Sequence, residues 1–188
     1  MIDLLIVDDE QYIRQGIRDG IDWEKHGVHV CGTAVNGREA LTLIEKYMPG
    51  IVITDVRMSD MDGLELLEII DNQYPNIKVI LISGYKDFYY VQSAVEFNAM
   101  YYLLKPIDAN ELLSKVIEAK KVIENQLSNL KKDLNIQKKL EENMSVIRDE
   151  YLLRLIKGRL TTSIDIRKAV DILQFKEEDQ FCMALLKL

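Results

Sequence analysis

Cysteine is scarce in this chain of 188 residues, which contains only Cys31 and Cys182. Two thiols so far apart in the sequence make neither a disulfide framework nor a metal cage. Long apolar runs are missing too, since the first one ends at Val7 and is too short for a signal peptide or a membrane span. We therefore expect a protein of the reducing cytoplasm without a membrane partner.

An excess of basic charge is also lacking, because 24 Lys and Arg stand against 31 Asp and Glu, for a net charge of −7. This balance argues against a chain-wide nucleic-acid surface. The charge is unevenly placed: residues 1–108 hold 18 acidic and 9 basic side chains, and residues 109–188 hold 13 and 15. The two parts are therefore expected to do different jobs.

Glycine and proline are nearly absent from the second part, where only Gly158 follows Pro106. Long helix is thus permitted there. Heptad-like apolar spacing predicts a helix over 109–157 that forms a marginal coiled coil and a homodimer. Lys120 and Gln137 interrupt its seam, which consists of Val116, Ile123, Leu127, Leu130, Leu134, Leu140, Met144, Ile147 and Tyr151. The first turns are expected to pack on their own domain.

In the first part, short apolar runs alternate five times with amphipathic stretches. The predicted strands are Ile2–Val7, Val28–Val35, Ile51–Thr54, Val79–Ser83 and Met100–Leu104, and the predicted helices lie near 11–20, 37–47, 63–73, 86–98 and from 109 onward. Several runs are apolar on both faces, which is typical of a covered parallel sheet. The prediction is a doubly wound α/β domain over 1–120. Residues 160–188, with a short helix at 164–173 and a strand-like run at 181–186, are interpreted as a fragment of a following domain.

Polar residues follow four of these strands, where the edge of a parallel sheet gathers reactive groups. They are Asp8, Asp9 and Glu10, then Asp55, then Ser83 and Gly84, then Lys105 and Pro106. Each has an ordinary alternative as a helix cap, a turn or a solvated amine. Together, however, crowded acids raise one another's pKa unless a cation sits among them, and Mg²⁺ suits such ligands. An aspartate beside Mg²⁺ and a lysine is a nucleophile for phosphoryl transfer.

The chain resembles the receiver domains of two-component response regulators over about 1–120. Five motifs carry the resemblance in order: Leu5-Ile-Val-Asp-Asp-Glu10, Ile53-Thr-Asp-Val-Arg-Met58, Met61-Asp-Gly63, Ile82-Ser-Gly84 and Tyr102-Leu-Leu-Lys-Pro106. The resemblance implies a flavodoxin-like five-stranded parallel sheet with strand order 2-1-3-4-5.

It also implies roles for single residues. Asp55 is the phosphoacceptor, and Mg²⁺ is held by Asp8, Asp9, Asp55 and the backbone carbonyl of Arg57. Lys105 contacts the phosphoryl group, with a cis Lys105–Pro106 bond. Ser83 and Tyr102 form the switch pair, in which Ser83 moves to the phosphate and Tyr102 rotates inward.

Narrower features, such as Asp22-Trp-Glu24 and Tyr151-Leu-Leu-Arg-Leu-Ile-Lys-Gly158, resemble AraC-type response regulators. The expected partner is a sensor histidine kinase, with DNA bound only through a domain absent from this chain and no enzymatic turnover. The alternatives are a Mg²⁺-dependent aspartyl-phosphate phosphatase, a flavin carrier, whose phosphate the acids after the first strand would repel, and an inert receiver acting as a coiled-coil adaptor.

Overall fold

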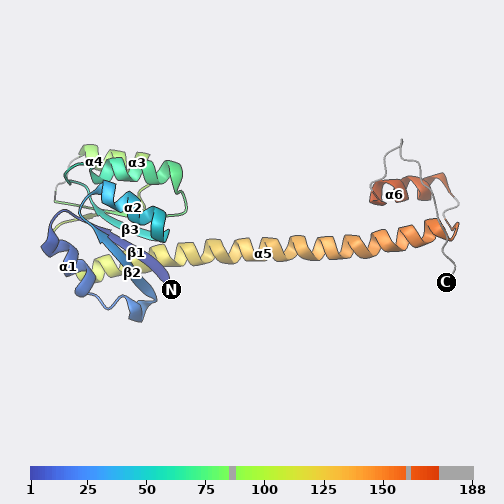
Figure 1. The fold of residues 1–188 in the computed structure, drawn as a ribbon, viewed down its shortest axis with the longest axis horizontal. Helices are drawn as coiled ribbons and strands as arrows, with labels where there is room; N and C mark the ends of the chain where they lie inside the picture. Colours follow the sequence, from blue (N-terminus) through green and yellow to red (C-terminus); the bar gives the residue numbers. More distant parts are fainter. Residues whose placement is uncertain (85–87, 160–161, 174–188) are drawn as a thin grey trace. The chain divides into compact units, whose positions relative to one another are not determined.

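The computed structural model describes residues 1–84, 88–159 and 162–173 (Figure 1). The chain forms two compact units, Met1–Leu127 and Ser128–Leu188. The first unit contains a five-stranded sheet, all of whose neighbouring strands are parallel, in the order β2-β1-β3-β4-β5. The predicted doubly wound parallel sheet and its strand order are confirmed.

The strands and helices follow the predicted alternation closely. The strands are β1 (Ile2–Val7), β2 (Val28–Ala34), β3 (Ile51–Asp55), β4 (Lys78–Ser83) and β5 (Tyr101–Leu104). The helices are α1 (Gln11–Asp19), the short 3₁₀ helix η1 (Glu24–His26), α2 (Gly37–Tyr47), α3 (Gly63–Gln73), α4 (Phe88–Glu96), α5 (Ala109–Ile156) and α6 (Ser163–Leu173).

Two hydrophobic cores lie on the opposite faces of the sheet, because successive side chains of a strand point to opposite sides. On β1, Leu5 and Val7 belong to the core that includes residues of α2 and α3, whereas Leu4 and Ile6 belong to the core with α1 and the start of α5. Figure 1 shows the two groups of helices on the two sides of the sheet. The central strands are thus buried on both faces, which explains their uniformly apolar sequence.

The loop after β3 is held tightly against the start of α3. Asp62 and Glu65 form a capping box at the beginning of this helix, which satisfies two backbone donors that a helix start leaves unpaired. The amide of Gly63 donates to the carbonyl of Val56 at 2.9 Å. These bonds fix the chain directly after Asp55.

The first turns of α5 pack on the sheet, as expected, and this packing extends further than the sequence indicated. Leu112, Val116 and Ala119 are buried, and Ile123 packs partly against the same core. Lys120 was interpreted as an interruption of the coiled-coil seam, yet its Nζ donates to the carbonyl of His26 at 2.7 Å. Lys120 and Ile123 therefore pack the helix against its own unit. The exposed part of the predicted coiled-coil seam begins only after them, at Leu127.

In the second unit, α6 matches the short helix predicted at 164–173. Its buried Ala169 and a bond from the Arg148 guanidinium on α5 to the carbonyl of Ile172, at 3.2 Å, join the two helices. The strand-like run at 181–186 lies outside the described residues. Within the described part of the chain, no helix is both long enough and apolar enough to cross a membrane.

Candidate functional site: an acidic cluster bridged by a lysine

The ammonium of Lys105 lies between two buried carboxylates at the carboxyl edge of the sheet. Its Nζ is 3.0 Å from Asp8 Oδ2 and 2.9 Å from Asp55 Oδ2. Asp8 is 1% exposed and Asp55 6% exposed. A third carboxylate, that of Glu10, stands 3.7 Å from the same nitrogen. Residues that are far apart in the sequence are thus joined into one charged cluster.

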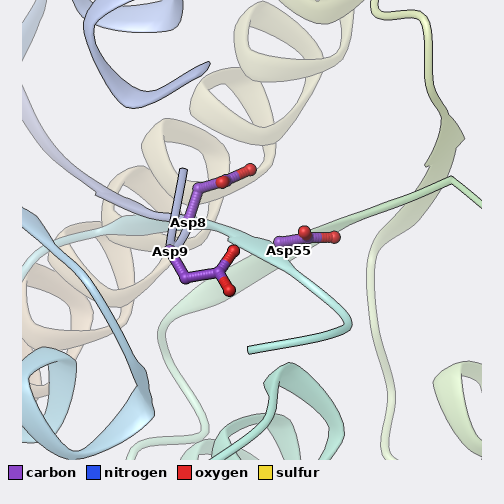
Figure 2. A group of neighbouring side chains, drawn as sticks. All are labelled: Asp8, Asp9 and Asp55. Atoms are coloured by element: carbon purple, nitrogen blue, oxygen red, sulfur yellow. The ribbon is translucent and has the colours of Figure 1, made fainter. Parts of the chain in front are cut away.

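Asp9 completes the acidic group. Figure 2 shows Asp8 and Asp9 leaving adjacent positions after β1, beside Asp55 at the end of β3. One carboxylate oxygen from each of the three lies within 4.8 Å of the others, with Asp9 exposed. A hollow of about 410 Å³ opens over this cluster, lined by Asp9, Glu10, Asp55, Arg57, Gly84 and Lys105. The site is therefore open to a small ligand.

The ionisation of this cluster reflects burial and mutual attraction. Burial raises the pKa of Asp8 and outweighs the opposing hydrogen bonds from Lys105 and the Glu10 amide. Burial alone would lower the pKa of Lys105, but the hydrogen bonds to Asp55 and Asp8 prevail and the pKa is raised. The lysine therefore stays protonated as the counter-charge of the two buried acids.

Short local bonds hold these side chains in place. Asp8 Oδ1 accepts from the Glu10 amide at 2.8 Å, and Asp55 Oδ1 accepts from the Val56 amide at 2.8 Å. The Lys105 amide donates to the Ser83 carbonyl at 2.8 Å, which ties the end of β5 to the end of β4. Asp8 had an alternative as the cap of α1, but Glu10 occupies that position and gives no side-chain cap.

The other predicted site residues lie after β3, at the end of β4 and on β5. Ser83 is buried at the end of β4, and Tyr102 of β5 is half-buried against the core on the α2–α3 side. Tyr102 is in register with Leu81, so Ser83, two residues after Leu81, shares its face of the sheet. Arg57 lines the hollow. The Lys105–Pro106 bond is cis, as the resemblance implied.

Sequence reasoning missed Arg14, a residue of α1. Its Nη1 donates to the backbone carbonyl of Asp8 at 2.5 Å. The sequence shows only that an arginine follows Asp8 by six residues. Such a spacing between an acidic residue and an arginine is too common to indicate a contact. Arg14 contacts the peptide that joins the two acids rather than either carboxylate.

The donor set fits a magnesium ion. Carboxylate oxygens are the ligands that Mg²⁺ prefers, and oxygens on opposite sides of one Mg²⁺ are about 4.2 Å apart. The three aspartates already come within 4.8 Å of one another, so small side-chain movements suffice. The hollow above them leaves room for water and for a further ligand.

Comparison with known proteins identifies the fold and the family. The model of the response regulator receiver domain matches residues 4–117. The transcriptional regulatory protein YesN of Bacillus subtilis is 36% identical over 158 residues, which are 84% of this chain and 43% of YesN. The transcriptional regulatory protein HptR of Staphylococcus aureus is 31% identical over 178 residues, covering 93% of this chain and 69% of HptR.

A solved structure is similar as well. The receiver domain of the response regulator AraT from Geobacillus stearothermophilus has a TM-score of 0.63 at 37% identity, covering 67% of this chain and 98% of that one. The match covers less than half the length of YesN, and the matches to YesN and HptR both extend past residue 117, where the receiver-domain match ends. The matched residues, the parallel sheet and the acidic edge agree, and the chain belongs to the response regulator receiver-domain family of two-component systems.

Proposed function

We propose that this chain is a phosphorylation-dependent switch that accepts a phosphoryl group on Asp55 from a sensor histidine kinase. The observation that carries the proposal is the lysine bridge, in which Lys105 Nζ lies within 3.0 Å of both Asp8 and Asp55 beside Asp9. Asp8, Asp9, Asp55 and the Arg57 carbonyl would hold Mg²⁺. When bound, the ion would neutralise charge on the phosphoryl oxygens.

The residues divide the chemistry among them. A carboxylate oxygen of Asp55 forms the new bond to phosphorus while the P–N bond of the donor phosphohistidine breaks, and its electron pair stays on the imidazole. The Lys105 ammonium, already 2.9 Å from Asp55, neutralises charge on the transferred group. The Ser83 hydroxyl would move toward the transferred group and donate a hydrogen bond to a phosphate oxygen. Tyr102, on the same face of the sheet, would occupy the space that this movement opens.

The output we propose is control of transcription, in the cytoplasm and without multiple-turnover catalysis. The support comes from the similarity to the transcriptional regulatory proteins YesN and HptR. The excess of acidic over basic residues in 1–108 also suits a regulatory role better than direct DNA contact.

Labelling tests the phosphoacceptor. The full chain with Mg²⁺ and a small phosphodonor should gain the mass of one phosphoryl group, and Asp55→Asn or removal of the cation should abolish the gain. Asp60→Asn, which changes an exposed aspartate in the following loop, is the matched control and should be labelled fully. Stoichiometric labelling supports the switch, whereas many turnovers of donor per chain would favour the phosphatase. Unchanged labelling of Asp55→Asn would refute the assignment.

A second experiment tests the switch pair. Ser83→Ala should still be labelled, because Ser83 is no nucleophile here, but it should show smaller amide chemical-shift changes around Tyr102 on phosphorylation. A response equal to that of the wild type would remove Ser83 from the switch.

We also propose that two copies pair through α5. Leu127, Leu130 and Leu134 are 51%, 59% and 63% exposed and follow heptad spacing. Burial of three leucines contributes roughly 5 to 9 kcal/mol per helix, against an association cost of about 4 to 15 kcal/mol. The pairing should therefore be weak and concentration-dependent.

Sedimentation of the full chain tests this pairing. Leu130→Asp should shift the equilibrium to monomer, whereas Val146→Asp, at an exposed position outside the seam, should not. A wild-type chain that is monomeric at high micromolar concentration would exclude the α5 dimer.

A further inference from the structure

Arg14 holds the peptide group that links Asp8 to Asp9. Its side chain is half-buried, and its Nη1 donates to the Asp8 carbonyl at 2.5 Å across six residues of chain. A peptide unit is planar, so fixing this carbonyl also fixes the amide of Asp9. The direction of the backbone at Asp8 and at Asp9 depends on the orientation of this one peptide plane.

This peptide lies beyond the sheet and needs an anchor of its own. β1 ends at Val7, and the last bond toward β2 runs from the Asp8 amide to the Ala34 carbonyl at 3.2 Å. The Asp8 carboxylate is fixed separately, by the Glu10 amide and Lys105. The contact from Arg14 therefore orients the one backbone carbonyl that stands between the two carboxylates.

We propose that Arg14 is a positioning residue of the cation site. By holding the Asp8–Asp9 peptide, it keeps the carboxylates of Asp8 and Asp9 converged on Asp55, without contacting the ion or the phosphoryl group. This inference rests on the proposed binding of Mg²⁺ to the three aspartates. It assigns a role in that site to a residue of α1, which contributes no ligand.

Charge and positioning predict opposite effects when Arg14 is replaced. A guanidinium near a divalent cation repels it, so if Arg14 acted only as a charge, a neutral residue would tighten Mg²⁺ binding. If Arg14 acts by holding the peptide, its loss weakens binding, and outer-shell residues of metal sites typically change affinity about 10- to 100-fold. The sign of the change therefore decides between the two.

The experiment measures Mg²⁺ binding to the full chain by calorimetry, with Mn²⁺ binding followed by electron paramagnetic resonance as a second probe. Arg14→Met should bind both ions about tenfold more weakly. Arg14→Lys, which retains a donor and a charge, should recover most of the affinity. Arg18→Met is the matched control, because Arg18 lies one turn further along α1 and pairs with the exposed Asp19 at 2.7 Å; its affinity should equal that of the wild type.

Two results overturn the inference. Arg14→Met that binds Mg²⁺ as tightly as the wild type, or more tightly, shows that Arg14 does not position the site. A wild-type chain that binds neither ion refutes the proposed function itself, and the positioning role with it. If Arg14→Met fails to fold, Arg14→Gln, which is uncharged and shorter, makes the same distinction, since weaker binding supports positioning and tighter binding supports a charge effect alone.

Discussion

Replacing Gly63 with alanine would test the packing that holds Asp55 in place. Gly63 begins α3, and a Cβ built on it would lie 2.0 Å from the carbonyl oxygen of Asp55 and 3.0 Å from the Cα of Val56. Both neighbours are backbone atoms of the segment at the end of β3, and Gly63 also donates to the Val56 carbonyl at 2.9 Å. No side-chain rotation can therefore relieve the overlap.

The size of the effect follows from this geometry. A carbon and an oxygen in ordinary contact are about 3.3 Å apart, so the added methyl group overlaps the Asp55 carbonyl by more than 1 Å and must push α3 away from β3. Overpacking of this kind costs about 1 to 3 kcal/mol or more. Gly63 is the first residue of α3, so the propensity gain of alanine in a helix interior does not offset this cost. We expect Gly63→Ala to lose about 2 kcal/mol, a large part of a total stability of about 5 to 15 kcal/mol.

Urea unfolding followed by the fluorescence of Trp23 measures this loss. Trp23 is the single tryptophan of the chain and is 3% exposed in the core beside α1. The matched control is Gly16→Ala, because a Cβ on Gly16, in the middle of α1, would meet nothing within 4 Å. That variant should gain about 0.5 to 1 kcal/mol.

The two glycines should thus respond with opposite signs to the same substitution. If Gly63→Ala unfolded at the urea concentration of the wild type, the close approach of α3 to the end of β3 would be wrong. Equal labelling of Gly63→Ala and wild type by a phosphodonor would show that the position of Asp55 tolerates this displacement.

Three further predictions follow from the buried charges and the free thiol. Lys105→Met leaves Asp8 and Asp55 without their shared counter-charge and should destabilise the metal-free chain by about 3 kcal/mol; Mg²⁺ should raise its urea midpoint more than that of the wild type, and equal shifts would contradict the bridging role. Burial, and then the charge of Asp3, raises the pKa of Cys31 to about 11, so in a Cys182→Ser background its alkylation near neutral pH should be about 100-fold slower than that of an ordinary thiol. The free energy of unfolding should fall as the pH rises above about 9, because the thiol then ionises readily in the unfolded chain but not in the folded one. A free energy of unfolding that stays unchanged between about pH 9 and 10.5 would contradict this expectation.

The sheet and the acidic edge were predictable from the sequence because both depend on local patterns. Strands buried on two faces are apolar at every position, as in Leu4 to Val7, and this pattern marks them within about one residue. The topology of a parallel sheet then brings the residues after each strand to one edge. Asp8, Asp55 and Lys105 could therefore be grouped without any knowledge of their distances.

Contacts that depend on three-dimensional packing were not predictable in the same way. Lys120 interrupts an apolar seam in the sequence, and only the fold brings it to the His26 carbonyl, 94 residues away. Arg14 resembles any polar residue of an amphipathic helix until its contact with Asp8 is seen. Glycine in the Met61-Asp-Gly63 motif indicates a turn, but not a distance of 2.0 Å from the Asp55 carbonyl to a Cβ.

The position of Lys105 connects the acidic cluster with the long helix. Its ammonium bridges Asp8 and Asp55, and its amide is tied to the Ser83 carbonyl. Asp108, three residues further on, begins α5 by accepting bonds at 2.8 and 2.9 Å from the amides of Asn110 and Glu111. A ligand that draws the Lys105 ammonium away from Asp8 and Asp55 therefore acts on a residue that is separated from the cap of α5 by only a short loop. The next turns of α5 are buried in the core through Leu112 and Val116. The charged cluster at the edge of the sheet and the packing of α5 on the core therefore belong to one packed structure.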